Sequence, residues 1–215
     1  MLKMPKLTEN QKLGLSILGA IAVTAAFGVL LSVAPDFVQR PQRTPSGVAA
    51  GKYRAVSDFE LTDQTGKSVR LSDFRGRPLL LAFGYTQCPD ICPLTLADFK
   101  AVKRELGTDA ERATFVLVSL DPERDTPEVL QRYLAVFDKS FVGLTGPDAQ
   151  IRRLTDQLDA SYEKQKPDPE SGAYSVAHTS FIYLFDVQGK WSMTYPFQSP
   201  AEAIAKDLRQ MLVSP

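Results

Sequence analysis

Continuous apolar runs alternate along the chain with stretches whose apolar residues recur at helical spacing. The runs at residues 78–84 and 114–120 carry few polar side chains, which is typical of strands buried on both faces of a sheet. The first run leads into residues 93–106, where Leu96 and Phe99 begin one face of a helix. The same patterns predict further helices near residues 127–137, 151–158 and 200–212, and further strands at residues 54–61, 68–71, 141–144, 180–187 and 191–195.

The order of these elements predicts the fold class. Buried strands alternate with amphipathic helices, and a hairpin and a last helix follow, which indicates an α/β domain whose mixed sheet has helices on both faces. A thioredoxin-like fold fits this order. Thr126 followed by Pro127 is a typical helix start, and a hairpin is expected around residues 63–66. The polar residues 163–172 are expected to form an exposed, mobile loop.

One apolar segment near the N-terminus stands apart from this domain pattern. Residues 13–34 contain no charged side chain, and a helix of this length can cross a membrane. A cleaved signal peptide is the alternative, but the run is longer than a typical signal core and Pro35 follows the only cleavage-like sequence. Lys3, Lys6 and Lys12 precede the run, so the N-terminus is expected in the cytoplasm.

The chain therefore divides into four expected parts. Residues 1–12 are a cytoplasmic N-terminus, residues 13–34 a single transmembrane anchor, residues 35–51 a polar linker, and residues 52–215 the thioredoxin-like domain. The expected location is a bacterial inner membrane, with the C-terminal domain in the periplasm. In an oxidising compartment a close pair of cysteines can form a disulfide.

Charge and composition exclude several classes of protein. The chain has 25 basic and 25 acidic residues, so it lacks the basic excess of a general nucleic-acid-binding protein. It contains two cysteines and one histidine, which are too few for a structural zinc site with four such ligands. A single bridge between cysteines four positions apart would stabilise very little, which excludes a disulfide scaffold.

The two cysteines lie in the sequence Cys88-Pro-Asp-Ile-Cys92-Pro93, between a buried strand and a helix. Pro93 fits the first helical position, which predicts Cys92 at the N-cap. Free amide groups and the helix dipole there favour a thiolate, the form that attacks disulfides and binds metals. The plainer interpretation is a pair of inert buried thiols, which the strand–loop–helix context disfavours.

His178 lies just before a predicted strand. A lone histidine is more often structural than a ligand, but in thioredoxin-like folds the loop entering this strand lies against the cysteine loop. That loop usually holds a cis-proline, and no proline occurs between Tyr174 and Pro196. Two thiolates and one imidazole form a soft set of three ligands, so Cys88, Cys92 and His178 favour copper. Three ligands suffice for Cu(I), whereas zinc needs a fourth ligand and Cu(II) an additional oxygen or nitrogen.

Three aspartates are candidates for an auxiliary role at this site. Asp90 lies inside the cysteine loop, and Asp121 and Asp125 follow the second buried strand. Each could supply an outer ligand or orient His178. The alternative is ordinary turn and cap chemistry, which the Asp-Pro and Asp-Thr-Pro sequences also fit.

Three separated motifs resemble the Sco/SenC copper proteins: the cysteine motif after Tyr85-Thr86, Asp121-Pro-Glu-Arg-Asp125-Thr-Pro127, and His178 before the strand at residues 181–186. The resemblance implies a thioredoxin-like domain that binds Cu(I) and Cu(II) through the two cysteines and the histidine. It also implies delivery of copper to the CuA site of cytochrome c oxidase, or reduction of that site's cysteines. The implied partners are the oxidase subunit carrying CuA and a periplasmic copper donor.

Two enzymatic alternatives remain beside a copper chaperone. A thiol–disulfide oxidoreductase would use Cys88 and Cys92 as a redox disulfide, although such enzymes usually carry Cys-x-x-Cys. A peroxidase of the peroxiredoxin type would need a proline ahead of its cysteine, and residues 83–88 contain none.

Overall fold

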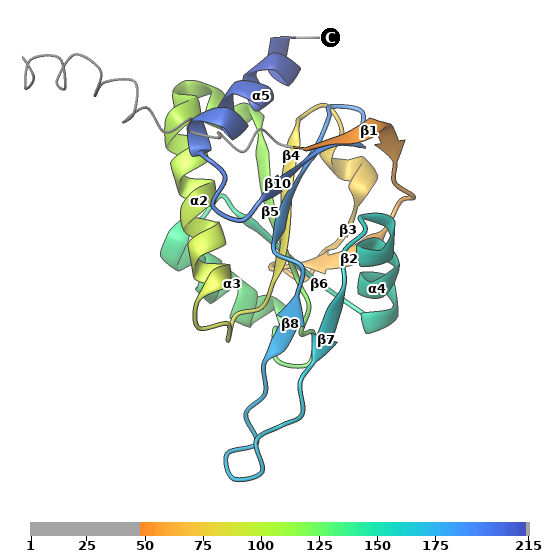
Figure 1. Cartoon of the computed structure of the whole chain (residues 1–215), viewed down its shortest axis with the longest axis vertical. Helices are drawn as coiled ribbons and strands as arrows, with labels where there is room; N and C mark the ends of the chain where they lie inside the picture. Colours follow the sequence, from red (N-terminus) through yellow and green to blue (C-terminus); the bar gives the residue numbers. More distant parts are fainter. Residues whose placement is uncertain (1–47, 214–215) are drawn as a thin grey trace, which may run out of the picture. The chain divides into compact units, whose positions relative to one another are not determined.

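The computed structural model describes residues 48–213 (Figure 1). The predicted cytoplasmic segment and membrane span, residues 1–34, lie outside this range, as does most of the predicted linker. Within residues 48–213 no helix is both long enough and apolar enough to cross a membrane.

A mixed sheet runs through the described domain in the order β1-β10-β9-β4-β5-β6-β2-β3. The central strands β4, β5 and β6 are parallel, while β9, β10 and β1 on one side and β2 and β3 on the other pair antiparallel. The strands of this sheet are β1 (Val48–Ala55), β2 (Glu60–Asp63), β3 (Ser68–Arg70), β4 (Leu79–Gly84), β5 (Thr114–Ser119), β6 (Val142–Thr145), β9 (Phe181–Phe185) and β10 (Lys190–Pro196).

Helices cover both faces of this sheet, as the sequence pattern predicts (Figure 1). They are α2 (Ile91–Leu106), α3 (Pro127–Phe137), α4 (Asp148–Gln157) and α5 (Ala201–Val213), with short 3₁₀ turns η1 (Leu71–Phe74) and η2 (Gly107–Arg112). Helices α2, α3 and α5 share one hydrophobic core with the sheet, and α4 shares the other.

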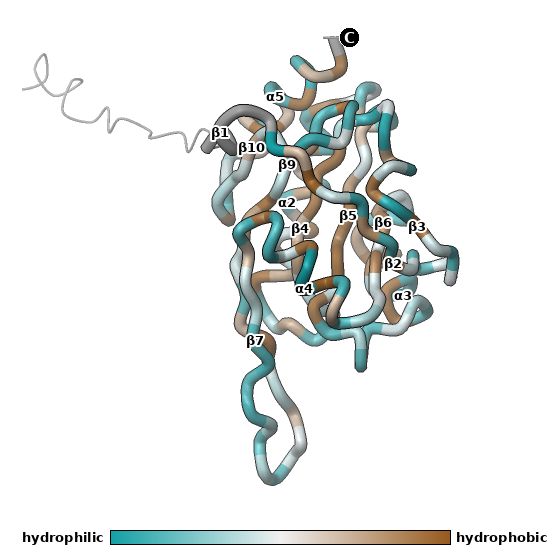
Figure 2. The backbone as a smooth tube through the Cα atoms, turned by 90° about the vertical axis from the view of Figure 1, so that its right-hand side faces the viewer, coloured by the Kyte–Doolittle hydropathy of each residue, from teal (hydrophilic) through white to brown (hydrophobic). Residues whose placement is uncertain are grey.

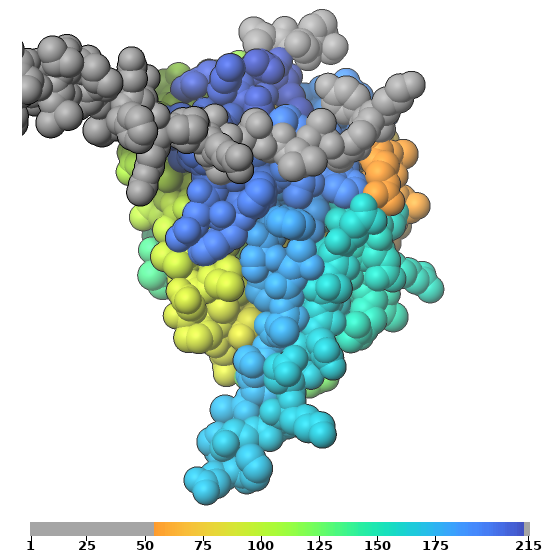
Figure 3. Space-filling view, viewed as in Figure 1, coloured from red at the N-terminus to blue at the C-terminus, as the bar shows by residue number. Residues whose placement is uncertain are grey.

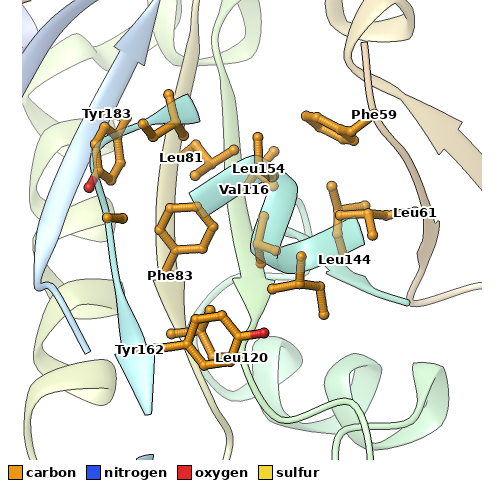
Figure 4. Packing of buried hydrophobic residues seen from close by; sticks show 14 of the residues in the cluster. Phe59, Leu61, Leu81, Phe83, Val116, Leu120, Leu144, Leu154, Tyr162 and Tyr183 are labelled. Atoms are coloured by element: carbon orange, nitrogen blue, oxygen red, sulfur yellow. The ribbon is translucent and has the colours of Figure 1, made fainter. Parts of the chain in front are cut away.

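Strand β4 separates these two cores. Leu80 and Ala82 pack in the core under α2 and α5, whereas Leu81 and Phe83 pack in the opposite core with α4 residues such as Leu154 (Figure 4). A strand that is buried on both faces has no solvent-exposed position for a polar residue, which explains the continuous apolar run of β4. Figure 2 shows the same hydrophobic interior along the central strands.

The N-terminal strands differ from the prediction. The predicted strand at residues 54–61 is two strands: its first residues end β1, which pairs with β10, and its last residues begin β2, which forms the expected hairpin with β3. Strand β1 begins at Val48, inside the predicted linker. Alanine and glycine dominate the start of its sequence, so no alternating apolar pattern marks this strand, which pairs with β10.

The polar segment at residues 163–172 is also more regular than predicted. Strands β7 (Tyr162–Lys164) and β8 (Val176–His178) pair antiparallel in a separate ribbon whose tip projects from the sheet (Figures 1 and 2). At the tip the Asp168 amide donates to the Ala173 carbonyl at 2.8 Å, and the Asp168 carboxylate accepts the Ser171 amide at 2.7 Å. The prediction of an exposed loop is therefore confirmed for residues 165–172, which lie outside both strands and are exposed, while residues 163–164 belong to β7 and a side-chain-capped turn closes the tip.

Candidate metal centre

The cysteine motif connects the end of β4 to the start of α2. The helix begins at Ile91 with Asp90 as its N-cap residue, so Cys92 is the second residue of the helix rather than its N-cap. Pro93 is the third helical residue, where its missing N–H costs nothing because first-turn amides have no partner within the helix. The Asp90 side chain is exposed and makes no capping hydrogen bond.

This shift changes which sulfur benefits from the helix start. The Cys92 amide donates to the Cys88 sulfur at 3.4 Å. Burial acts to raise the pKa of the Cys88 thiol, but hydrogen bonds from the Asp90, Cys92 and Ile91 amides and from the Cys92 thiol outweigh burial, and the net pKa is lowered. Burial, followed by the hydrogen bond to Cys88, strongly raises the pKa of Cys92. These shifts therefore favour a thiolate at Cys88 rather than at Cys92, where the sequence predicts it.

Cys92 is held in a tight position against β4. Only 1% of its surface is exposed, whereas Cys88 is half-buried. A β-carbon on Gly84 would lie 3.0 Å from the Cys92 sulfur and 3.1 Å from the Leu117 Cδ1 atom. Glycine at the end of β4 thus makes room for the sulfur, a role that the sequence pattern gives no reason to assign.

His178 comes from the last position of β8 and meets the cysteines from the other side. Its Nε2 atom lies 3.6 Å from the Cys92 sulfur, and its Nδ1 atom lies 3.0 Å from the Thr179 carbonyl oxygen. A proton on Nδ1 satisfies that carbonyl and leaves the Nε2 lone pair facing the sulfur. Burial lowers the pKa of His178, against the opposing effect of the Thr179 carbonyl, so the ring is neutral at pH 7, as a metal ligand must be. The Tyr85 ring packs edge-on against the imidazole, 6.3 Å between centroids.

The spacing of Cys92 and His178 fits a shared metal ion. For a first-row ion with metal–sulfur and metal–nitrogen bonds of about 2.3 and about 2.0 Å, tetrahedral or trigonal angles place the two ligand atoms roughly 3.5–3.7 Å apart. The observed separation is 3.6 Å. A soft sulfur and an imidazole nitrogen at this spacing suit copper or zinc better than a hard ion.

The third predicted ligand, Cys88, lies beside this pair but is turned to the helix amides. Across residues 48–213 no group of three or more His, Cys, Asp or Glu side chains is already gathered around one metal position. Both cysteines are free thiols, so this is the reduced form of the pair. Metal binding through all three residues requires the Cys88 side chain to exchange its amide contacts for the ion.

Asp125 is fully buried and fastens the cysteine loop to β5. Its carboxylate accepts the Thr86 amide at 3.0 Å, the Thr86 hydroxyl at 2.6 Å and the Ser119 hydroxyl at 2.6 Å. Burial raises the pKa of Asp125 despite these hydrogen bonds. Its oxygens are occupied by protein partners, so the described geometry makes it a support of the cysteine loop.

Asp121 is also fully buried, and its partners lie on the ribbon and its own turn. It pairs with Arg124 and accepts the Tyr174 hydroxyl at 2.7 Å, and the Lys164 ammonium lies 3.6 Å away. Within the described residues no hydrogen bond joins any of the three candidate aspartates to His178. The structure thus brings together Cys88, Cys92 and His178 and leaves Asp90 exposed at the helix start.

Comparisons with known proteins agree with this fold. The SCO1/SenC family model matches residues 48–213. The SCO2-like protein of Rickettsia felis is 32% identical over 196 residues, covering 88% of this chain and 96% of that protein. Copper-bound ScoI of Bradyrhizobium japonicum is 37% identical, with a TM-score of 0.67 over 73% of this chain and 99% of that one.

BsSco, a member of the Sco family of cytochrome c oxidase assembly proteins with an identified disulfide switch, is 25% identical, with a TM-score of 0.63 over 79% of this chain and 99% of that one. The fold predicted as thioredoxin-like is therefore the Sco fold, with its mixed sheet and two helical layers. The matched family model spans the whole described domain, including both cysteines and His178. This chain belongs to the SCO1/SenC family.

Proposed function

We propose that this protein binds copper through Cys88, Cys92 and His178 and serves in the assembly of cytochrome c oxidase. The observation that carries the proposal is the 3.6 Å separation between the Cys92 sulfur and a neutral imidazole nitrogen. The copper-bound ScoI of Bradyrhizobium japonicum and the oxidase-assembly role named for the Sco family support copper as the metal and the oxidase as the destination.

The two cysteines contribute differently to holding the ion. Cys88 is half-buried, with a lowered pKa, so its sulfur is the accessible thiolate that meets incoming copper first. Cys92 is buried with a raised pKa, so it releases its proton when the metal binds. His178 needs no proton loss. Copper is the cargo, and handover is an exchange of these ligands for those of a partner at the Cys88 side.

Removal of the imidazole tests this proposal in the full-length protein. His178→Ala is expected to lower bound copper and to abolish the wild-type thiolate-to-Cu(II) absorption, measured by metal analysis and visible spectroscopy. Ser180→Ala, which removes a small polar group from the same segment, is the matched control and should retain both. Wild-type copper content and spectrum in His178→Ala would refute the ligand set.

In more detail, the proposed role is that the protein receives copper from a periplasmic donor and delivers it to the oxidase subunit that carries CuA. A thiol–disulfide reductase acting on that subunit is the second candidate, because a half-buried Cys88 with a lowered pKa beside a buried Cys92 is the arrangement of an attacking and a resolving thiol. A reductase keeps its dithiol activity in His178→Ala and loses it in Cys88→Ser. A copper donor loses CuA metallation in both variants.

The proposed setting is the outer face of a bacterial inner membrane. Residues 13–34 supply one anchor, and the lysines before them keep the N-terminus inside. Membrane fractionation and a periplasm-dependent reporter fused after Pro215 test this topology. Recovery of the full chain in the soluble fraction, or an inactive reporter, would contradict it.

A further inference from the structure

Arg124 joins the cysteine loop to the ribbon that carries His178. Its Nη1 atom donates to the Gln87 side-chain oxygen and to the Tyr174 carbonyl, each at 3.1 Å. Its Nε atom donates to Asp121, and its guanidinium stacks on the Tyr174 ring with the Cζ atom 3.6 Å from the centroid. One side chain thus contacts a residue beside Cys88, the turn after β5 and the ribbon.

The ribbon is attached to the same turn through both of its strands. The Tyr174 hydroxyl, just before β8, donates to Asp121 at 2.7 Å. The Lys164 ammonium, at the end of β7, pairs with Glu123 at 2.9 Å. Asp121 has no exposed surface and the Arg124 side chain is 18% exposed, so their ion pair is largely shielded from solvent. An arginine that is shielded from solvent and can form two parallel hydrogen bonds fixes both the distance and the orientation of the groups that it joins.

The turn after β5 also contacts the cysteine loop. Asp125 holds Thr86 at the start of the cysteine loop. The turn at residues 121–125 therefore positions both halves of the metal site, the cysteine loop through Asp125 and the ribbon through Arg124.

We propose that Arg124 is a positioning residue that holds the ribbon, and with it the His178 ring, against Cys92. This role rests on the proposed copper function, because it concerns the geometry of the copper ligands. Cu(I) is well served by two soft thiolates, whereas Cu(II) depends more on the imidazole nitrogen. Loss of Arg124 should therefore weaken Cu(II) binding more than Cu(I) binding.

The direction in which copper affinity changes distinguishes a positioning role of Arg124 from a purely electrostatic effect of its charge. The Arg124 guanidinium lies 5.9 Å from the Tyr85 ring centroid, and that ring packs on His178, so a positive charge stands near the copper position. Removing a nearby cation would by Coulomb repulsion alone strengthen copper binding. Removing a positioning group weakens it.

The experiment measures Cu(II) and Cu(I) affinity of the full-length protein by ligand competition. Arg124→Gln is expected to bind Cu(II) about 10- to 100-fold more weakly, the usual cost of removing a group that orients a metal ligand. Arg124→Lys keeps the charge but loses the fork, so it should recover only part of the loss. Tyr174→Phe removes one hydrogen bond to Asp121 and should weaken Cu(II) binding in the same direction. Arg54→Gln is the control, because Arg54 stacks on Trp191 and pairs with Asp159, and within the described residues it has no hydrogen bond or ion pair to the cysteine loop, to the turn at residues 121–125 or to β7 and β8.

A double-mutant comparison decides whether Arg124 acts through the imidazole. In a His178→Ala background, Arg124→Gln should cause no further loss of Cu(II) affinity, and in the single Arg124→Gln variant the nitrogen coupling in the Cu(II) EPR spectrum should weaken. Unchanged or tighter Cu(II) binding in Arg124→Gln and Tyr174→Phe, or an equal loss without His178, would overturn the inference. Wild-type copper binding by His178→Ala would instead overturn the proposed function.

Discussion

Replacing Gly84 by alanine should damage the metal site through one added methyl group. The new β-carbon would lie 3.0 Å from the Cys92 sulfur, 3.3 Å from the Cys92 β-carbon and 3.1 Å from Leu117 Cδ1, whereas ordinary contacts begin near 3.4 Å. Gly84 does not have a positive φ, so alanine causes no backbone strain of its own. The damage therefore comes from overlap with Cys92 and Leu117.

The expected magnitude follows from these contacts. Overpacking of a filled core costs about 1–3 kcal/mol, which lowers the melting temperature of a domain of this size by roughly 2–12 °C. The Cys92 sulfur must shift by about 0.4 Å to restore an ordinary contact, and since its β-carbon is also crowded, rotation of the side chain cannot absorb the whole shift. Copper affinity should fall and the thiolate-to-Cu(II) absorption should move.

Gly143→Ala is the matched control. A β-carbon at Gly143 would meet Leu134 Cδ1 at 2.7 Å and Leu130 Cβ at 3.2 Å, in the contact of β6 with α3 and without touching either cysteine. Both variants are compared by thermal unfolding, copper competition and visible spectroscopy. Gly143→Ala should lose stability and keep its copper spectrum. The reasoning is refuted when Gly84→Ala retains the wild-type copper affinity and spectrum.

Three further results are expected. Iodoacetamide should alkylate Cys88 in the folded, metal-free protein and spare Cys92 until denaturant is added, as read by mass spectrometry, and equal labelling would contradict the assigned asymmetry. Asp125→Ala should lower the free energy of unfolding, measured with denaturant, by at least about 2 kcal/mol because it leaves buried donors unpaired. A loss of less than about 0.5 kcal/mol would contradict this. Burial lowers the pKa of His178 below its ordinary value of 6.5, so as the pH falls the imidazole is protonated in the unfolded chain before it is protonated in the folded one. The free energy of unfolding of the metal-free protein should therefore decrease as the pH drops below 6.5. His178→Gln should make this decrease shallower, and identical pH profiles for the two proteins would contradict the prediction.

The central fold could be predicted because burial leaves a direct mark on the sequence. β4 and β5 are continuous apolar runs since both of their faces lie in a core, and the start of α3 carries its own cap, where the Thr126 hydroxyl accepts the Val129 amide. The Cys88, Cys92 and His178 cluster could be proposed for the related reason that strand ends and helix starts meet at one edge of the sheet.

Other features leave no such mark. β1 begins with small residues, and β7 and β8 have three residues each, which is too short for an apolar pattern to show, although Tyr162 and Val176 are buried in a core. The helix starts two residues earlier than predicted because Asp90 caps α2 without a side-chain hydrogen bond, so the cap has no chemical signature. The partners of Asp121 are remote in sequence, and its connection to Tyr174 can be found only in three dimensions.

The ribbon's construction makes its outer end a natural place for grafts. Strands β7 and β8 pair with each other, and the turn at Asp168 is capped by its own residues. The tip projects from the rest of the domain (Figure 3), and none of residues 165–173 belongs to either hydrophobic core. Pairs of residues can be added or deleted there without changing the register of the main sheet. A fluorophore or an affinity tag inserted beside Glu170 would therefore report on the protein while leaving its interior undisturbed.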